Sequence, residues 1–224
     1  MPNTIRIAIL DDHASIIDGY KFRLSEAPDC EVVATATYGA ELEPMLAQGG
    51  IDVLLLDITV PVSAEDDSTY PMVDKLPEIV RKHPGTRVLV ISMHKQSYLI
   101  QHALDVGTAG FVLKDDMEVT RKLDEVIRQV NAGSIFVSEA ARELIDSPNK
   151  KIITPRQLEV LNYFANDPSL STSKVAEELH IAHSTVRNLL STTYAKLGVR
   201  NLPAAIEEAR KKGLITPQSP EHQE

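Results

Sequence analysis

The sequence predicts an α/β domain followed by a smaller all-α domain. In the first half of the chain, short apolar runs alternate with segments of helix length, a pattern typical of parallel strands that cross over through helices. From residue 154 onward the apolar residues follow helical spacing only. The chain has 224 residues and is therefore long enough for two domains.

Four short, mainly apolar runs predict the buried strands of a parallel sheet. They are Ile5–Leu10, Val53–Leu56, Val88–Ile91 and Gly110–Leu113. The intervening segments predict helices over Ser15–Glu26, Gly39–Gln48, Met72–His83, Ser97–Val106 and Val119–Ala132. Five βα units of this kind predict a flavodoxin-like (βα)5 domain over residues 1–132.

Polar residues directly follow each of the four runs: Asp11 and Asp12, Asp57, Ser92, and Lys114. Ligands of parallel sheets bind at this edge. One aspartate after a strand is often only a turn former or a helix cap. Three carboxylates at one edge, however, repel one another unless a hard cation such as Mg²⁺ lies between them. A lysine and a hydroxyl then remain to hold a phosphoryl group, which predicts a phosphorylatable pocket.

The residues around these strand ends resemble the receiver domain of two-component response regulators over about residues 4–132. The resemblance rests on the stretches 7–13, 54–61, 90–93 and 110–114. It implies that a sensor histidine kinase transfers a phosphoryl group to Asp57, and that Ser92 and Lys114 contact that group. It further implies Mg²⁺ held by Asp11, Asp12, Asp57 and the backbone carbonyl of Thr59, and Phe111 as an aromatic residue that turns inward on activation.

Residues 62–71 depart from this family, because they form a longer and more acidic loop than usual. Two interpretations stay open. The loop is either a solvated insertion, which costs little entropy, or its residues Glu65, Asp66 and Asp67 tune kinase choice or phosphoryl lifetime.

The two parts of the chain differ in net charge. Residues 1–146 hold 13 Lys and Arg against 24 Asp and Glu, a net charge of −11, whereas residues 147–224 hold 10 against 8, a net charge of +2. Nucleic acid is therefore expected to contact the second part only. The single cysteine, Cys30, excludes an internal disulfide. No apolar run is long enough to span a membrane, and the start is not a signal peptide, so we expect a cytoplasmic protein with no membrane contact.

A linker with a short amphipathic helix is expected over residues 133–151, the second domain over 152–216, and a disordered tail over 217–224. Thr154, Pro155 and Gln157 predict a capping box at the first helix of the second domain. Helices near Ser173–Leu179 and Ser184–Leu197, separated by a tight turn, then predict a helix-turn-helix.

The second domain resembles the LuxR-type DNA-binding domain, through the stretches 153–161, 174–181, 184–187 and 196–199. A receiver joined to such a four-helix domain resembles the NarL/FixJ family, whose members regulate transcription and are not enzymes. The resemblance implies binding to double-stranded DNA as a homodimer after phosphorylation. The candidate DNA contacts, of which Arg187 and Asn188 are suited to read bases, are Ser184, Thr185, Arg187, Asn188, Ser191, Lys196 and Arg200.

This domain also departs from its family, with Leu189, Leu202 and Ala182 in place of a common histidine, arginine and serine, and with a longer segment at 165–169. With a charge of only +2, a monomer is expected to bind DNA weakly, so that binding needs a dimer or an auxiliary protein partner. A helical face made by Leu202, Ala205, Ile206 and Ala209 is a candidate dimer surface; the alternative is packing against the preceding helix.

Two other functions are alternatives to a DNA-binding response regulator. A phosphatase of the haloacid-dehalogenase type needs an Asp-x-Asp after an early strand, and this chain has Asp11-Asp12-His13 instead. The second is a regulator whose output domain binds a protein rather than DNA, which the sparse positive charge favours.

Overall fold

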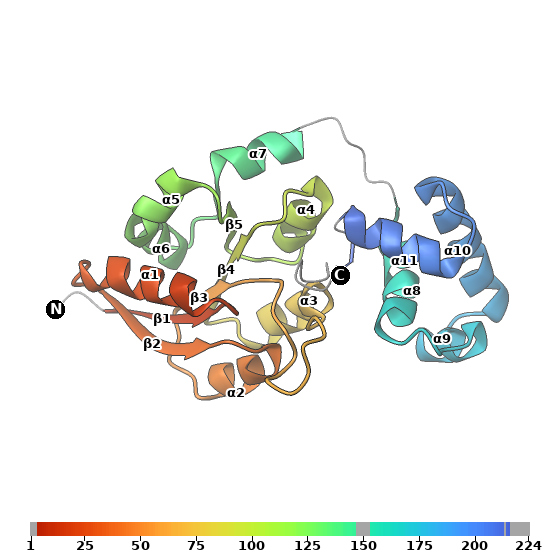
Figure 1. The fold of residues 1–224 in the computed structure, drawn as a ribbon, viewed down its shortest axis with the longest axis horizontal. Helices are drawn as coiled ribbons and strands as arrows, with labels where there is room; N and C mark the ends of the chain where they lie inside the picture. Colours follow the sequence, from red (N-terminus) through yellow and green to blue (C-terminus); the bar gives the residue numbers. More distant parts are fainter. Residues whose placement is uncertain (1–3, 147–152, 213, 216–224) are drawn as a thin grey trace. The chain divides into compact units, whose positions relative to one another are not determined.

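The computed structural model describes residues 4–146, 153–212 and 214–215 (Figure 1). These residues form two compact units, one that ends with residue 146 and one that begins with residue 153.

The first unit is built on a parallel sheet with the strand order β2-β1-β3-β4-β5-β6. Three of the four strands expected from apolar runs have the expected bounds, and the fourth, β4, is one residue longer at each end. The strands are β1 Ile5–Leu10, β2 Cys30–Ala36, β3 Val53–Leu56, β4 Arg87–Ser92, β5 Gly110–Leu113 and β6 Phe136–Val137. The flavodoxin-like class is thus confirmed.

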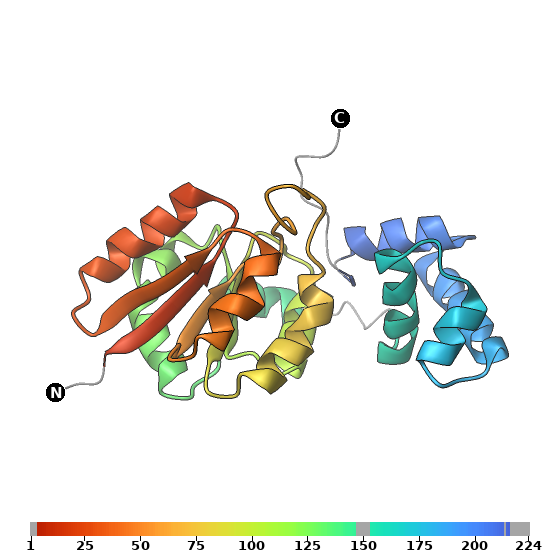
Figure 2. The ribbon, with the colours of Figure 1, turned by 90° about the horizontal axis from the view of Figure 1, so that it is seen from below.

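Helices cover both faces of the sheet. One core layer lies between the sheet and α1 and α6, and the other between the sheet and α2, α3, α4 and α7. Figures 1 and 2 show α1 and α2 on opposite sides of β1 and β2. The helices are α1 Ala14–Ser25, η1 Gly39–Glu41, α2 Leu42–Ala47, α3 Met72–Lys82, α4 Ser97–Asp105, α5 Met117–Arg121, α6 Leu123–Asn131 and α7 Glu139–Asp146.

The helix expected over Val119–Ala132 is in fact two helices. The side chain of Asp116 accepts a hydrogen bond from the Val119 amide at 3.1 Å, so α5 begins two residues earlier than predicted. The chain leaves helical geometry at Lys122, where φ is −109° and ψ is 30°, and α6 starts after it. The apolar spacing of α6 hid this break.

Residues 136–146 belong to the first unit, although we expected them in a linker with a short helix. Phe136 donates its amide to Ala109 O at 3.0 Å and Ser138 donates to Phe111 O at 3.1 Å, which adds β6 to the sheet. Gly110 permits this approach, because a Cβ there would overlap the carbonyl of Phe136. The expected short helix is α7, and it packs on the core through the fully buried Ala141. The first unit therefore extends past residue 132. Most of the remaining linker and the tail at 217–224 lie outside the described residues.

The acidic loop at residues 62–71 is a short hairpin with an exposed tip. Pro61 and Thr69 form an antiparallel bridge, and Val62 donates to Ser68 O at 2.9 Å. At the base of the hairpin, the Tyr70 ring lies against Gly39, where an added Cβ would overlap it. The three acidic residues at the tip are exposed. The loop is thus an insertion whose tip is solvated and whose base is packed.

The second unit contains the four expected helices: α8 Pro155–Asn166, α9 Thr172–Glu178, α10 His183–Leu197 and α11 Leu202–Lys211. The capping box at the start of α8 is confirmed, with Pro155 in the first turn. The candidate dimer face is corrected. Ala205, Ile206 and Ala209 are buried within this unit, because α11 packs against α8 and α10, and they are not available to a second chain.

Of the helices in the described residues, none has the length and apolar character that crossing a membrane requires.

Candidate functional site

Four neighbouring strands bring the predicted polar residues together. Asp11 follows β1, Asp57 follows β3, Ser92 ends β4 and Lys114 follows β5, and these strands are adjacent in the sheet. The exposed fractions of Asp11, Asp57 and Ser92 are 2%, 6% and 0%. Groups this polar are buried only when they are paired, so the pocket is an assembled site.

Lys114 is the cation that pairs the two buried carboxylates. Its Nζ lies 2.6 Å from Asp11 Oδ2 and 2.7 Å from Asp57 Oδ2. Burial raises the pKa of Asp57 to about 6, although the charge of Lys114 acts in the opposite direction. Burial alone would lower the pKa of Lys114, but the charges of Asp57 and Asp11 outweigh it and hold that pKa above its ordinary value. Asp57 is thus a desolvated carboxyl beside a firmly charged amine.

The acidic residues after β1 offer ligands for a metal ion. Atoms of Asp11, Asp12 and His13 lie within 4.8 Å of one another. The amide of His13 donates to Asp11 Oδ1 at 3.0 Å, and its Nδ1 lies 2.7 Å from Asp12 Oδ1. The amide of Thr59 donates to Asp57 Oδ1 at 3.1 Å, which places Thr59 beside the pocket. Carboxylate oxygens dominate this group, so its chemistry fits a hard divalent cation such as Mg²⁺.

His94 is a pocket residue that the sequence analysis missed. Its Nε2 lies 2.8 Å from Thr59 Oγ1, and its amide donates to Ser92 Oγ at 3.1 Å. Burial, helped by the nearby charge of Lys114, lowers the pKa of His94. The side chain therefore ties the loop after β3 to the loop after β4. Its place two residues after Ser92 is a weak signal, because nothing in the sequence pairs it with Thr59.

Phe111 connects the pocket strand with the helices on one face of the sheet. Its side chain is fully buried in the same core layer as Ile100 of α4 and Ala141 of α7. In this structure the ring already occupies an inward position.

In the second unit, α9 and α10 form the expected helix-turn-helix. The turn between them contains His180 at φ 52°, and Ala182 is the N-cap of α10 without a side-chain hydrogen bond. Val186, Leu190, Thr193 and Leu197 are the buried stripe of α10. All the candidate DNA contacts are exposed: Ser184, Thr185, Arg187, Asn188, Ser191, Lys196 and Arg200. The helix α10 thus has a buried inner face and an exposed outer face, and the candidate contacts on the outer face stay predictions.

Lys196 also has a partner inside the unit. Its Nζ donates to Gln157 Oε1 at 3.0 Å, and Gln157 Nε2 donates to Thr192 Oγ1 at 2.6 Å. The same Gln157 oxygen accepts from the Thr154 amide at 2.9 Å. One buried glutamine thus joins the cap of α8 to the exposed face of α10.

Models of two families match this chain. The response regulator receiver domain matches residues 7–128, and the luxR family of bacterial regulatory proteins matches residues 151–209.

Individual proteins are similar along almost the whole chain. The oxygen regulatory protein NreC of Staphylococcus aureus (strain USA300) is 29% identical, with 94% of this chain and 99% of that protein covered. RcsB from Salmonella enterica serovar Typhimurium, solved bound to a promoter with the phosphomimetic BeF3-, is 22% identical, has a TM-score of 0.63 and covers 92% of this chain and 98% of its own. ChrA, a response regulator of a heme-sensing two-component system, is 26% identical, has a TM-score of 0.50 and covers 95% of this chain and 100% of its own.

The receiver match spans more than half of the chain, and the assembled pocket and the helix-turn-helix agree with the two matched families. Members of this family are DNA-binding regulators and not enzymes. The chain belongs to the two-component response regulators that carry a LuxR-type DNA-binding domain.

Proposed function

We propose that a sensor histidine kinase phosphorylates this response regulator on Asp57 and that the phosphorylated protein binds double-stranded DNA as a homodimer. The observation that carries the proposal is the buried Asp57 carboxylate, with one oxygen on Lys114 and the other on the Thr59 amide.

The pocket residues divide the work of phosphoryl transfer. Transfer in line needs positioning and neutralisation of charge on the phosphoryl oxygens. Hydrogen bonds to Lys114 and Thr59 hold Asp57 in one orientation, and Lys114 then binds a phosphoryl oxygen once the new bond forms. Ser92 Oγ donates to another. Asp11, Asp12, Asp57 and the backbone carbonyl of Thr59 would hold Mg²⁺, which supplies further neutralisation of charge.

A packed route leads from the pocket to α7, at the end of the first unit. Ser92 ends β4, which pairs with β5, and Phe111 of β5 shares a buried core layer with α4 and α7. Drawing the Ser92 hydroxyl toward a phosphoryl group shifts the loop before α4. Because α7 packs on α4 and on β5, a change in that core is passed to the end of the first unit.

DNA binding is assigned to the outer face of α10. Arg187 and Asn188 are suited to bidentate contacts with guanine and adenine in the major groove, and the neighbouring hydroxyls to phosphates. The comparison with RcsB supports dimerisation, since one of its solved structures contains two RcsB dimers bound to two parallel DNAs.

Selection from a random pool of duplex DNA tests the whole proposal. The full chain is used at two salt concentrations, with and without Mg²⁺ and beryllofluoride, and Asp57→Ala serves as the control. We expect paired half-sites to be enriched, more strongly with the phosphoryl mimic, and the enhancement to vanish in the variant. Enrichment that is equal in both proteins contradicts control through Asp57.

A second candidate is an output domain that binds an auxiliary protein. Several lysines of the second unit form ion pairs with nearby glutamates of the same segment. Because these pairs leave less positive charge for DNA, they favour this candidate. These pairs include Lys174 with Glu178 at 3.2 Å, Lys211 with Glu207 at 2.6 Å and Lys212 with Glu208 at 3.0 Å. Absence of any enriched DNA in all conditions would select this candidate.

A further inference from the structure

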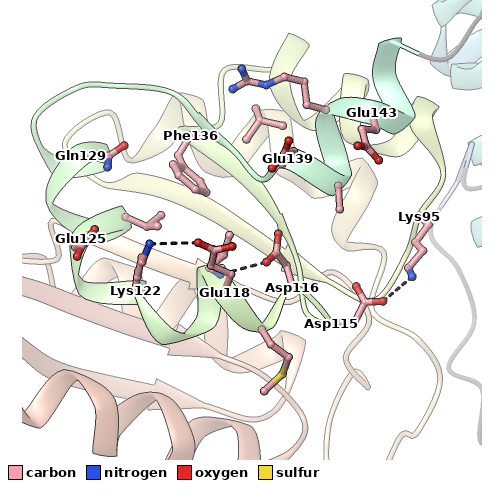
Figure 3. A pocket seen from close by; sticks show the side chains of 16 residues that line it. Lys95, Asp115, Asp116, Glu118, Lys122, Glu125, Gln129, Phe136, Glu139 and Glu143 are labelled. Atoms are coloured by element: carbon pink, nitrogen blue, oxygen red, sulfur yellow. Dashed lines mark hydrogen bonds and ion pairs between the residues drawn. The ribbon is translucent and has the colours of Figure 1, made fainter.

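A groove of about 870 Å³ lies at the β6 edge of the sheet, and the proposed function assigns it no ligand. We name it the β6 groove. Residues of α5, α6, β6 and α7 line it, together with Lys95 and Asp115. Figure 3 shows Phe136 on its floor, with Glu125 and Gln129 on the α6 side and Glu139 and Glu143 on the α7 side.

The floor of the β6 groove is an open strand edge. Neighbouring residues of a strand direct their backbone groups to opposite sides. Phe136 and Ser138 donate their amides to β5, so the backbone N–H and C=O of Val137 point away from the sheet and into the groove. β6 is the last strand in the order, and among the described residues no strand pairs with this edge. An edge of this kind is a template for one more strand.

The walls select the charge of the occupant. Six carboxylates line the β6 groove against three cations, a net charge of −3. Lys95 is paired with Asp115 at 2.5 Å and Lys122 with Glu118 at 3.2 Å. Within the described part of the chain, Glu125, Glu139 and Glu143 have no ion pair. Apolar side chains of Val119, Val126 and Ala140 lie among them, as an alternating strand requires.

We propose that the β6 groove docks an extended basic segment of a partner protein, which adds a strand beside β6. Backbone hydrogen bonds form with Val137. Lysine or arginine side chains on one face of the added strand reach Glu139 and Glu143 on the α7 side, and apolar side chains on the other face lie over Phe136 on the α6 side. None of the residues that contact the added strand belongs to the pocket around Asp57.

Fluorescence anisotropy with defined peptides tests the proposal on the full chain. The first probe is a labelled octapeptide in which lysine alternates with valine. The second has the same sequence with alternate backbone amides methylated, so that it keeps its charge and cannot pair as a strand. The third has glutamate in place of lysine. We expect the first probe to bind and the other two to bind at least about tenfold more weakly, since each loses one of the two kinds of contact.

Protein variants separate strand addition from charge alone. Val137→Pro removes the outward N–H and leaves both amide donors to β5 in place, so the fold is expected to survive at this edge position. The double variant Glu139→Lys with Glu143→Lys reverses the charge of two side chains on the α7 wall of the groove. Both variants are expected to weaken the lysine peptide at least about tenfold. The matched control, Glu26→Lys with Glu31→Lys, changes the net charge equally on the far side of the same unit and is expected to bind as the parent does.

Four outcomes overturn the proposal. Equal binding of the methylated and unmethylated peptides, or weakening by charge reversal without weakening by Val137→Pro, means that the groove only attracts cations. No binding of the lysine peptide removes the site. A self-association of the parent protein in sedimentation that Val137→Pro abolishes assigns the edge to a second copy of this chain instead.

Discussion

The two functional regions of this protein differ in how far their candidate residues are buried. In the receiver, the candidate residues are buried and hold one another: Lys114 alone binds both Asp11 and Asp57. In the DNA-binding domain, every candidate contact on α10 is exposed, and Lys196 donates a hydrogen bond to Gln157.

Because of this difference, the structure of the free protein defines the receiver pocket more completely than the DNA-binding surface. A pocket that binds a small group must be complete before the group arrives, because its geometry supplies the chemistry. A surface that reads another macromolecule is completed by that partner, and counterion release supplies much of its affinity.

The largest effect is expected from Asp57→Asn. The amide keeps the shape of the buried side chain and removes the nucleophile, so labelling by a small phosphodonor in Mg²⁺ is expected to fall from one phosphoryl group per chain to none. Intact-mass measurement records this. Asp18→Asn, on the exposed side of α1, is the matched control and is expected to label as the parent does. Labelling that survives in Asp57→Asn would show that the enclosed pocket is not the acceptor.

Arg187→Ala is expected to weaken binding to the selected duplex by about 1–3 kcal/mol, or roughly 5- to 150-fold, because a bidentate contact with one base is lost. Titration of the full chain with labelled DNA measures this. The control is Lys211→Ala on α11, whose cation is already paired with Glu207. If both variants lose affinity equally, the exposed face of α10 has no special part in recognition.

Gln157→Ala is expected to destabilise the second unit by about 1–3 kcal/mol, because it leaves the Thr154 amide, Thr192 and Lys196 without a shared partner. Urea unfolding of the full chain, followed for that unit, measures the loss. Glu159→Ala, which removes an exposed ion pair with Arg156, is expected to change stability by less than about 0.5 kcal/mol. If Gln157→Ala leaves the free energy of unfolding unchanged, the hydrogen bonds of Gln157 do not stabilise this unit.

Ala182→Ser carries the smallest effect. Ala182 has an extended backbone at the N-cap of α10, with φ −67° and ψ 143°, and no side-chain hydrogen bond. A serine hydroxyl there can accept the Ser184 amide and is expected to stabilise the unit by about 0.5–1 kcal/mol. The same substitution at the exposed Ala195, inside the helix, serves as the control and is expected to be slightly destabilising. Thermal unfolding separates the two signs.

The sequence predicted the central sheet well, because strands buried on both faces leave an unmistakable apolar run. It did not predict β6, since Phe136 and Val137 form a strand of two residues inside a segment with helical spacing. The break at Lys122 was missed for a related reason: a local change of φ and ψ leaves the apolar stripe of α6 intact. Periodicity reports which face is buried and not where the hydrogen bonds stop.

The sequence also predicted which residues form the pocket, but it did not predict which of them contact one another. Strand ends placed Asp11, Asp57, Ser92 and Lys114 together, because parallel strands share one carboxyl edge. The hydrogen bond between Thr59 and His94 joins two loops whose separation depends on the folded backbone. The candidate dimer face failed because an apolar helical stripe looks the same whether it packs inside one domain or between two chains.

The contact between Gly39 and Tyr70 has a consequence for how this protein can change over generations. A side chain at residue 39 would overlap the Tyr70 ring, so the base of the hairpin keeps its present position only while residue 39 is glycine. A change at either of these two positions therefore limits which residues the other can become.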